Sequence, residues 1–388
     1  MATPYPRIAR HAALRESAGL ADALADANGP VTAAAAVIRY HHLTHLVLST
    51  IDEAGLRPRV SPALVSAIEA VQPVQTLSVD ALLRGFEDVR DALDAAGVRV
   101  MLLKGLYFAE RLYGGYARRP QFDLDILVRA HDRRAAARAL VRAGFTRRAY
   151  DLHSQTFVRD QLKIDVHGWL RRAPAYRIDE AAVWTSARTV RVGGLDVVTL
   201  SDEYTLTLLG LASFEDLGQG MVRLKQLLDM FLLVRQVDAT FDWRGFFDRR
   251  AAEGVDGVLA TVLALVLSVF EGEQDASQLA AALDARSHLV TASSRGEVLD
   301  LVFAPRKHPA NLVWFGRVYP GSLARYLAVF WTAGFPANLR QLHAARLRAL
   351  LRAAAAAPAP PPAQAPSPQA SQPAGDTLSA RNAETEYK

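Results

Sequence analysis

Apolar residues recur at intervals of three and four through the first quarter of the chain. This period is typical of helices with one buried face, and it predicts helices over residues 12–27, 33–55 and 79–97. Prolines stand between these stretches and mark the breaks: Pro30, Pro58, Pro62 and Pro73. We therefore predict that residues 1–96 form a helical N-terminal region.

The period of the pattern changes after residue 97. A short apolar run over residues 98–103 predicts a central strand, and residues 122–128 alternate in two-residue steps as strands do. Between and after them, helical patterns over residues 106–115 and 131–144 each end at glycine. Two more strand-like runs follow, and together these elements predict the order β-α-β-α-β-β over residues 98–170.

The rest of the chain returns to helical spacing after one more pair of strands. Residues 188–200 predict a hairpin that turns at Gly193-Gly194, and Ser201 is placed to begin a helical region. The last residues are rich in Ala, Pro, Gln and Ser, which predicts a disordered tail. We therefore predict an α+β protein in which a small mixed sheet is flanked by N-terminal and C-terminal helical regions. The predicted borders are 1–96, 97–200, 201–352 and 353–388.

Composition narrows the classes of protein that fit this pattern. The 388 residues are 51% hydrophobic, which is ample for a buried core, and they include no cysteine. Disulfides, thiolate metal sites and a cysteine nucleophile are therefore excluded. The net charge of +5 permits an anionic partner such as a nucleotide but is no strong nucleic-acid signature.

Neither a membrane span nor a secretory signal is predicted. The longest uncharged apolar run covers residues 257–270, which is shorter than the roughly 20 residues of a spanning helix. The first residues have no apolar stretch of the kind that a secretory signal requires. We expect a cytoplasmic protein and interpret the run as a buried core helix.

Acidic residues lie on one face of two predicted strands. Asp123 and Asp125 share a face because side chains two residues apart point the same way, and Asp165 lies on a later strand of similar pattern. Carboxylates that lie together repel each other, and a divalent cation offsets that repulsion. If the strands are neighbours, the three oxygen donors suit Mg²⁺ or Mn²⁺. The alternative is an acidic patch exposed to solvent.

Several short motifs around these residues are characteristic in combination. The chain has a Leu-Leu-Lys-Gly strand end, an Arg-Pro pair before Asp-Leu-Asp-Ile-Leu-Val, a Gly-Phe at a helix end, and Asp-Val-His-Gly-Trp on a later strand. In this respect the chain resembles the uncharacterised nucleotidyltransferase family of the polymerase-beta-like superfamily. The motifs lie at Lys104-Gly105, Arg119-Pro120, Asp123, Asp125, Gly144-Phe145, Asp165, His167 and Trp169.

The resemblance implies roles for these residues. Asp123, Asp125 and Asp165 would be catalytic and would hold the metal ions. Nucleotide binding would fall to Lys104, Gly105, Arg119 and His167. The sequence favours a functional role for Lys104 over a strand-end lysine in solvent. For Arg119 an ordinary surface position fits equally well, and Arg118 is an alternative to it. His167 could simply hydrogen-bond within the sheet.

The implied reaction moves a nucleoside monophosphate from an NTP to an acceptor and releases pyrophosphate. The acceptor is left open among a small molecule, a protein and an RNA. One departure from the superfamily pattern is Lys104-Gly105, where a glycine-serine turn is usual. It supports the alternative of an inactive protein of this fold that binds nucleotides or regulates. A third hypothesis is an acceptor-binding helical protein that works in a complex.

Overall fold

The computed structural model of the chain describes residues 3–27, 30–71, 79–119, 121–150, 154–170, 178–218 and 222–286. All of them lie in the first of two compact units, Met1–Ala349. The last part of the predicted C-terminal helical region, residues 287–352, and the predicted tail over residues 353–388 lie outside the described residues.

Among the described residues, six α-helices precede the first strand. They are α1 (Tyr5–Leu14), α2 (Ser17–Ala25), α3 (Val31–Tyr40), α4 (Thr44–Glu53), α5 (Pro62–Ala70) and α6 (Val79–Asp94), with the 3₁₀ turn η1 (Arg57–Arg59) before α5. The helix predicted over residues 33–55 is wrong in one respect, because it is interrupted between α3 and α4. The stretch over residues 12–27 likewise divides between α1 and α2.

In the described part of the chain, seven strands form one mixed sheet in the order β3-β4-β5-β2-β1-β7-β6. They are β1 (Val100–Leu102), β2 (Leu124–Val128), β3 (Thr146–Tyr150), β4 (Ser154–Arg159), β5 (Leu162–His167), β6 (Arg188–Val192) and β7 (Leu195–Thr199). The pairs β1–β7 and β2–β5 are parallel and the other pairs are antiparallel. The predicted α+β class with a mixed sheet is confirmed, and so is the hairpin at Gly193-Gly194.

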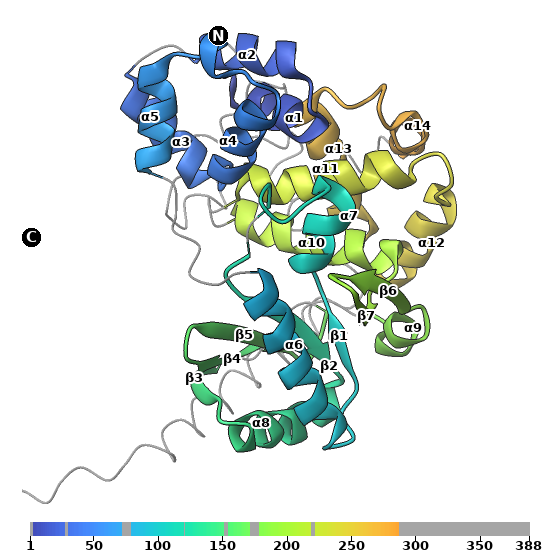
Figure 1. Cartoon of the computed structure of the whole chain (residues 1–388). Coiled ribbons are helices and arrows are strands. Elements are labelled where there is room, and N and C mark those ends of the chain that lie inside the picture. Colours follow the sequence, from blue (N-terminus) through green and yellow to red (C-terminus); the bar gives the residue numbers. More distant parts are fainter. Residues whose placement is uncertain are drawn as a thin grey trace, which may run out of the picture. The chain divides into compact units, whose positions relative to one another are not determined.

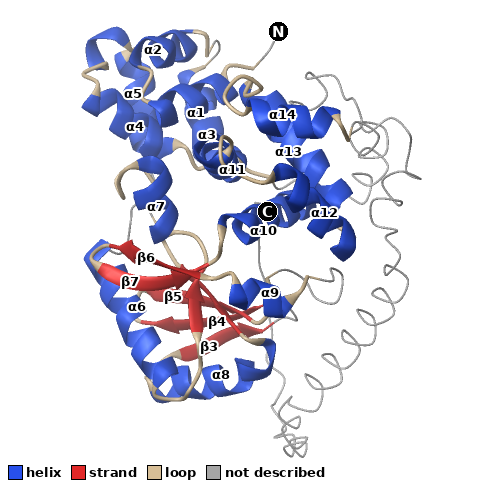
Figure 2. Ribbon diagram, turned by 90° about the vertical axis from the view of Figure 1, so that its right-hand side faces the viewer, coloured by secondary structure: helices blue, strands red, loops and turns tan. Residues whose placement is uncertain are grey.

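Helices α6 and α8 (Arg133–Arg142) cover one face of the sheet (Figure 2). Alternate strand residues point into this layer, so that Ile126 and Ile164 are fully buried beside Phe86 of α6. The opposite face carries Leu127 within a smaller apolar cluster that includes Trp184 of α9 (Glu180–Thr185). The acidic side chains of β2 and β5 lie on that opposite face.

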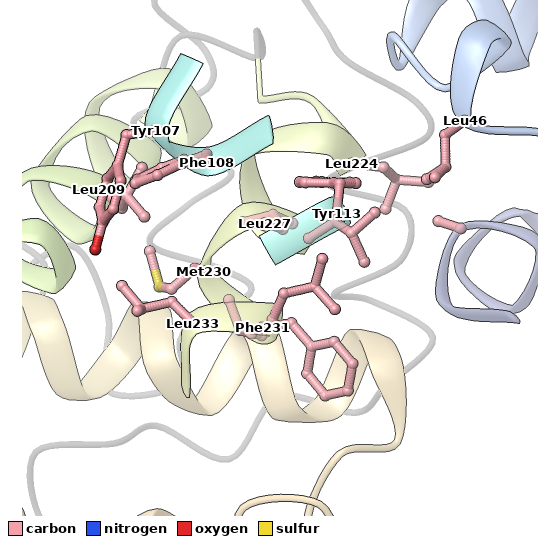
Figure 3. Packing of buried hydrophobic residues seen from close by; sticks show 14 of the residues in the cluster. Leu46, Tyr107, Phe108, Tyr113, Leu209, Leu224, Leu227, Met230, Phe231 and Leu233 are labelled. Atoms are coloured by element: carbon pink, nitrogen blue, oxygen red, sulfur yellow. The ribbon is translucent and has the colours of Figure 1, made fainter. Parts of the chain in front are cut away.

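The remaining helices form a bundle on the side of the sheet opposite to α6 and α8 (Figure 1). They are α7 (Leu106–Tyr113), α10 (Asp202–Gly218), α11 (Leu224–Val237), α12 (Trp243–Glu253), α13 (Asp256–Phe270) and α14 (Ser277–Asp284), and the turn η2 (Ala130–Asp132) precedes α8. Leu46, Tyr113 and Leu227 show how α4, α7 and α11 share one apolar cluster (Figure 3). The predicted core helix over residues 257–270 is confirmed as α13, most of whose side chains are buried.

Helix α13 has 15 residues, fewer than the roughly 20 of a transmembrane segment. None of the helices in the described ranges combines the length and the apolar character that a membrane crossing needs.

Candidate active site

Strands β2 and β5 bring two of the predicted carboxylates side by side. They pair in parallel, and the register places Asp125 directly beside Asp165. On the opposite face Leu124 and Ile164 are buried under the covering helices. The burial of these alternate residues fixes the register, since a slip of one residue would turn the apolar side chains to the cleft. The predicted adjacency of the two acidic strands is confirmed.

A lysine that lies between two acidic side chains compensates their charge. The Lys163 ammonium is 2.7 Å from Asp165 Oδ2 and 3.1 Å from Asp123 Oδ2. The hydroxyl of Thr156 donates to the other oxygen of Asp165 over 2.6 Å. Burial lowers the pKa of Lys163, but the hydrogen bond to Asp165 and the charge of Asp123 outweigh it and raise the pKa above its ordinary value. Lys163 is therefore charged at neutral pH.

Asp125 has two polar neighbours on the cleft side, Lys104 and His167, both predicted as site residues. Its carboxylate lies 3.4 Å from the Lys104 ammonium and 3.1 Å from Nε2 of His167. Burial raises the pKa of Asp125, whereas the Lys104 charge and the His167 hydrogen bond lower it well below its usual range. His167 thus hydrogen-bonds within the sheet, which is one of the two roles that the sequence left open.

The three carboxylates suit a divalent cation by their chemistry, although no metal-binding group is preformed. Within the described ranges, no three Asp, Glu or His side chains are arranged to hold an ion. The ammonium of Lys163 lies between Asp123 and Asp165. These carboxylates therefore already hold a cation, and their oxygen atoms are the donor type that Mg²⁺ and Mn²⁺ prefer. Lys163 is half-exposed, so it has room to move.

The turn between β1 and α7 places Lys104 and Gly105 beside this group. Gly105 has φ +72° and immediately precedes α7, a backbone conformation that favours glycine. Its carbonyl oxygen accepts a hydrogen bond of 3.1 Å from Arg119. The turn is therefore held in place from the loop that leads into β2.

Arg119 is buried, and its contacts are those of a positioning residue. Its guanidinium donates to both carboxylate oxygens of Asp229 on α11, over 2.9 and 2.7 Å. The Tyr113 hydroxyl donates to the same carboxylate over 2.7 Å. Direct contact of Arg119 with a phosphate stays a prediction.

Lys225 and Asp229 are four residues apart on a helix, a spacing that predicts an ion pair between them. This prediction is wrong, because the Asp229 carboxylate instead binds the guanidinium of Arg119.

Six predicted residues line a single cleft of about 410 Å³: Lys104, Arg119, Asp123, Asp125, Asp165 and His167. The same cleft is also lined from the helical regions by His42, Arg223 and Lys225, none of which was predicted as a site residue. Only the topology brings those helices to the acidic strands, so no local sequence pattern identifies them. The two-residue spacing places Lys163 on the same strand face as Asp165. Its ion pair with Asp123 could not be predicted from that spacing, because it depends on the pairing of β5 with β2.

The start of β2 differs from the prediction. The strand begins at Leu124 rather than at Phe122, so Phe122 and Asp123 lie in the preceding bend. Phe122 is 38% exposed instead of packing on the core, and its ring meets His45 of α4 edge-on at 6.5 Å. The alternation of apolar residues continues past the point at which pairing stops, which explains the error.

Comparison with known proteins agrees with this geometry. The family model described as "uncharacterised nucleotidyltransferase" matches residues 30–271, and the chain belongs to this family. Family membership assigns the chain to the nucleotidyltransferases, which are transferases that act on nucleotides. No curated protein matches the chain significantly.

A solved structure with some likeness is an antigenic nucleotidyltransferase-like protein from Paracoccidioides brasiliensis. It is 17% identical, and the match covers 54% of this chain and 94% of that chain with a TM-score of 0.34.

Proposed function

We propose that the protein is a metal-dependent nucleotidyltransferase that moves a nucleoside monophosphate from an NTP to an acceptor hydroxyl. The observation that carries the proposal is the register of β2 and β5, which sets Asp125 beside Asp165 at an open cleft with Asp123 at its edge. Family membership supports nucleotidyl transfer in general. The metal, the base of the NTP and the acceptor belong to the proposal.

The residues of the cleft have separate tasks in this scheme. Asp123 and Asp125 would hold Mg²⁺ or Mn²⁺ at the nucleotide phosphates, and Asp165 would share an ion near the acceptor. A divalent cation held there would supply positive charge against the negative charge that develops on the phosphoryl oxygens and would lower the pKa of the acceptor hydroxyl. Lys104 at the end of β1 would add a positive charge near the phosphates.

The reaction is an in-line displacement at the α-phosphorus. The acceptor oxygen forms a bond to phosphorus, the bond from phosphorus to the bridging oxygen breaks, and pyrophosphate leaves with the electron pair. The acceptor proton passes to Asp165 or to solvent. The buried pair Arg119–Asp229 keeps the Gly105 turn and α11 in fixed positions around the reacting groups.

A screen with each labelled NTP, with Mg²⁺ or Mn²⁺, tests the proposal directly. Asp165→Asn keeps the shape of the side chain and removes its charge. We expect this variant to bind NTP within about tenfold of wild type and to lose transfer by roughly two or more orders of magnitude. Asp123→Asn should lose both binding and transfer. Equal transfer rates for Asp165→Asn and wild type would refute the assigned role.

One observation favours a second candidate, an inactive protein that binds nucleotides or regulates. Lys163 lies between Asp123 and Asp165, where an ion would have to bind. An internal cation of this kind can replace a metal in holding the carboxylates together. Tight NTP binding by the wild-type protein, with no transfer to any acceptor under any metal, would support this candidate.

A further inference from the structure

A second cavity of about 240 Å³ lies beside the cleft and is built mostly from the N-terminal helices and the loop before β2. Leu43, Thr44 and His45 contribute three consecutive lining residues at the start of α4. Asp123 and Lys225 line both this cavity and the cleft, so the two spaces adjoin at the candidate active site. We call this second space the α4 cavity.

The start of α4 presents free hydrogen-bond donors to the α4 cavity. His42 has φ +58°, an uncommon backbone conformation for this residue, and it separates α3 from α4. The capping position is Leu43, which has no side chain that can accept from the first turn. Within the described ranges, the amide groups of Thr44, His45 and Leu46 have no acceptor. A helix N-terminus in this state attracts an anion.

An unpaired hydroxyl lies at the same place. Thr44 is 1% exposed and lines the α4 cavity, yet no described residue is a hydrogen-bond partner of its Oγ1. Leaving a buried hydroxyl without a partner is costly, by about 1–3 kcal/mol in general. An oxygen acceptor on a ligand in the α4 cavity would supply the partner that this hydroxyl lacks.

Lys225 supplies a charge that has no direct ion-pair partner among the described residues, although Asp229 and Asp123 act on it from farther away. Other charged groups of the α4 cavity have partners, because Arg118 pairs with Glu53 at 2.7 Å and Asp123 pairs with Lys163 at 3.1 Å. In contrast, no carboxylate among the described residues lies within ion-pair distance of the Lys225 ammonium. Burial and the neighbouring Arg119 lower the pKa of Lys225 to about 8, so the amine is mostly protonated at pH 7.

We propose that the α4 cavity binds an oxyanion carried by the acceptor, held by Thr44, Lys225 and the first-turn amides of α4. The inference rests on the proposed function, and it narrows the acceptor to a molecule with a phosphate or carboxylate group. Its reacting hydroxyl would lie on the side of Asp123, where the cavity joins the cleft. The N-terminal helices then contribute directly to substrate choice.

Titration of the full-length, metal-free protein with inorganic phosphate tests this site without requiring turnover. We expect binding by wild type and a loss of affinity of about tenfold or more in Thr44→Val and in Lys225→Gln, about 1.4 kcal/mol. Thr44→Ser and Lys225→Arg keep the hydroxyl and the charge, so each should retain most of the affinity. Thr32→Val, at an exposed threonine near the start of α3, is the matched control and should bind as wild type does. Circular dichroism checks that each variant folds.

A second titration, with Mg²⁺ and a saturating α,β-methylene NTP, identifies which substrate carries the anion. Phosphate that still binds through Thr44 and Lys225 supports the acceptor assignment. Phosphate displaced by the NTP would overturn it, because the anion would then belong to the triphosphate. Unchanged phosphate affinity in Thr44→Val and Lys225→Gln would overturn the site itself. A protein that binds phosphate through these residues but binds no NTP would count against the proposed function and for the anion site.

Discussion

At the scale of single residues, His41 connects the break after α3 to the start of α11. The side chain is buried, and its Nδ1 accepts a hydrogen bond of 3.2 Å from the backbone amide of Leu224. This bond requires an unprotonated Nδ1. Burial, with Arg223 and His42 nearby, lowers the pKa of His41 to about 3. The fold therefore holds this histidine neutral.

The low pKa of His41 predicts a pH-dependent loss of stability. Its folded pKa of about 3 is below the unfolded value near 6.5, so the contribution is complete above pH 6.5 and declines as the pH falls toward 3. Between pH 7.5 and 5 the loss should be about 2 kcal/mol. Urea unfolding at several pH values should show a steeper decline for wild type than for His41→Gln. Parallel curves for the two proteins would contradict the prediction.

The position of Lys163 between two carboxylates predicts how its removal changes their affinity for a metal ion. Its ammonium competes with an ion for Asp123 and Asp165. Lys163→Gln removes the competing charge, so the affinity for Mn²⁺ should rise by about tenfold, measured by the electron paramagnetic resonance of free Mn²⁺. Arg191→Gln, at an exposed surface ion pair, is the control and should leave the affinity unchanged. Weaker Mn²⁺ binding by Lys163→Gln would show that the lysine supports the metal site.

At the scale of elements, the sequence predicts β2 and β5 well because one face of each strand is buried. The alternation around Ile126 and Ile164 identifies both strands and puts Asp125 and Asp165 on the same side. The alternation of apolar and polar residues does not identify a strand whose two faces are both largely polar. Strand β3 was not predicted, because Thr146–Tyr150 is a largely polar strand at the sheet edge.

The break between α3 and α4 escaped prediction for a similar reason. The apolar spacing of residues 33–55 continues across it, and the chain turns at His42 with neither glycine nor proline. His41 and Lys225 come together only through packing between the N-terminal helices and α11, where the Lys225 amide donates to the His41 carbonyl. The α4 cavity therefore depends on how distant helices pack, and no short sequence motif predicts it.

The backbone conformation of the turn from β1 to α7, which carries Lys104, predicts the effect of a substitution at Gly105 on stability. Gly105 combines φ +72° with ψ −113°, and an added Cβ would lie 3.0 Å from Oε1 of Gln121. Gly105→Ala should therefore cost about 1–3 kcal/mol in the free energy of unfolding. Gly97→Ala, before β1, also has positive φ but meets nothing within 4 Å, so it should cost less. Equal costs would show that the contact with Gln121 is unimportant.

At the scale of the whole molecule, one apolar cluster joins regions that the sequence separates. It runs from Ile8 in α1 through Phe86 in α6 to Phe231 in α11 and Phe270 in α13. Helix α1 packs against both α11 and α13, which come from the other end of the described chain (Figure 1). Sequence patterns identify the segments that are helical, but they do not reveal which helices share a core. The borders at residues 96 and 200 stay predictions for this reason.

This shared core predicts that the N-terminal helices unfold together with the sheet. Scanning calorimetry of the full chain should show one main transition, with similar van't Hoff and calorimetric enthalpies. Ile8→Ala removes a fully buried side chain of α1 and should cost about 2–5 kcal/mol. Because the core is continuous, the variant should lower the whole transition rather than split off an early one. Val141→Ala, at a residue of α8 that is 54% exposed, is the control and should change the melting temperature little. A separate early transition in Ile8→Ala would mean that residues 1–96 fold as a domain of their own, and the α4 cavity would then form between domains free to move apart.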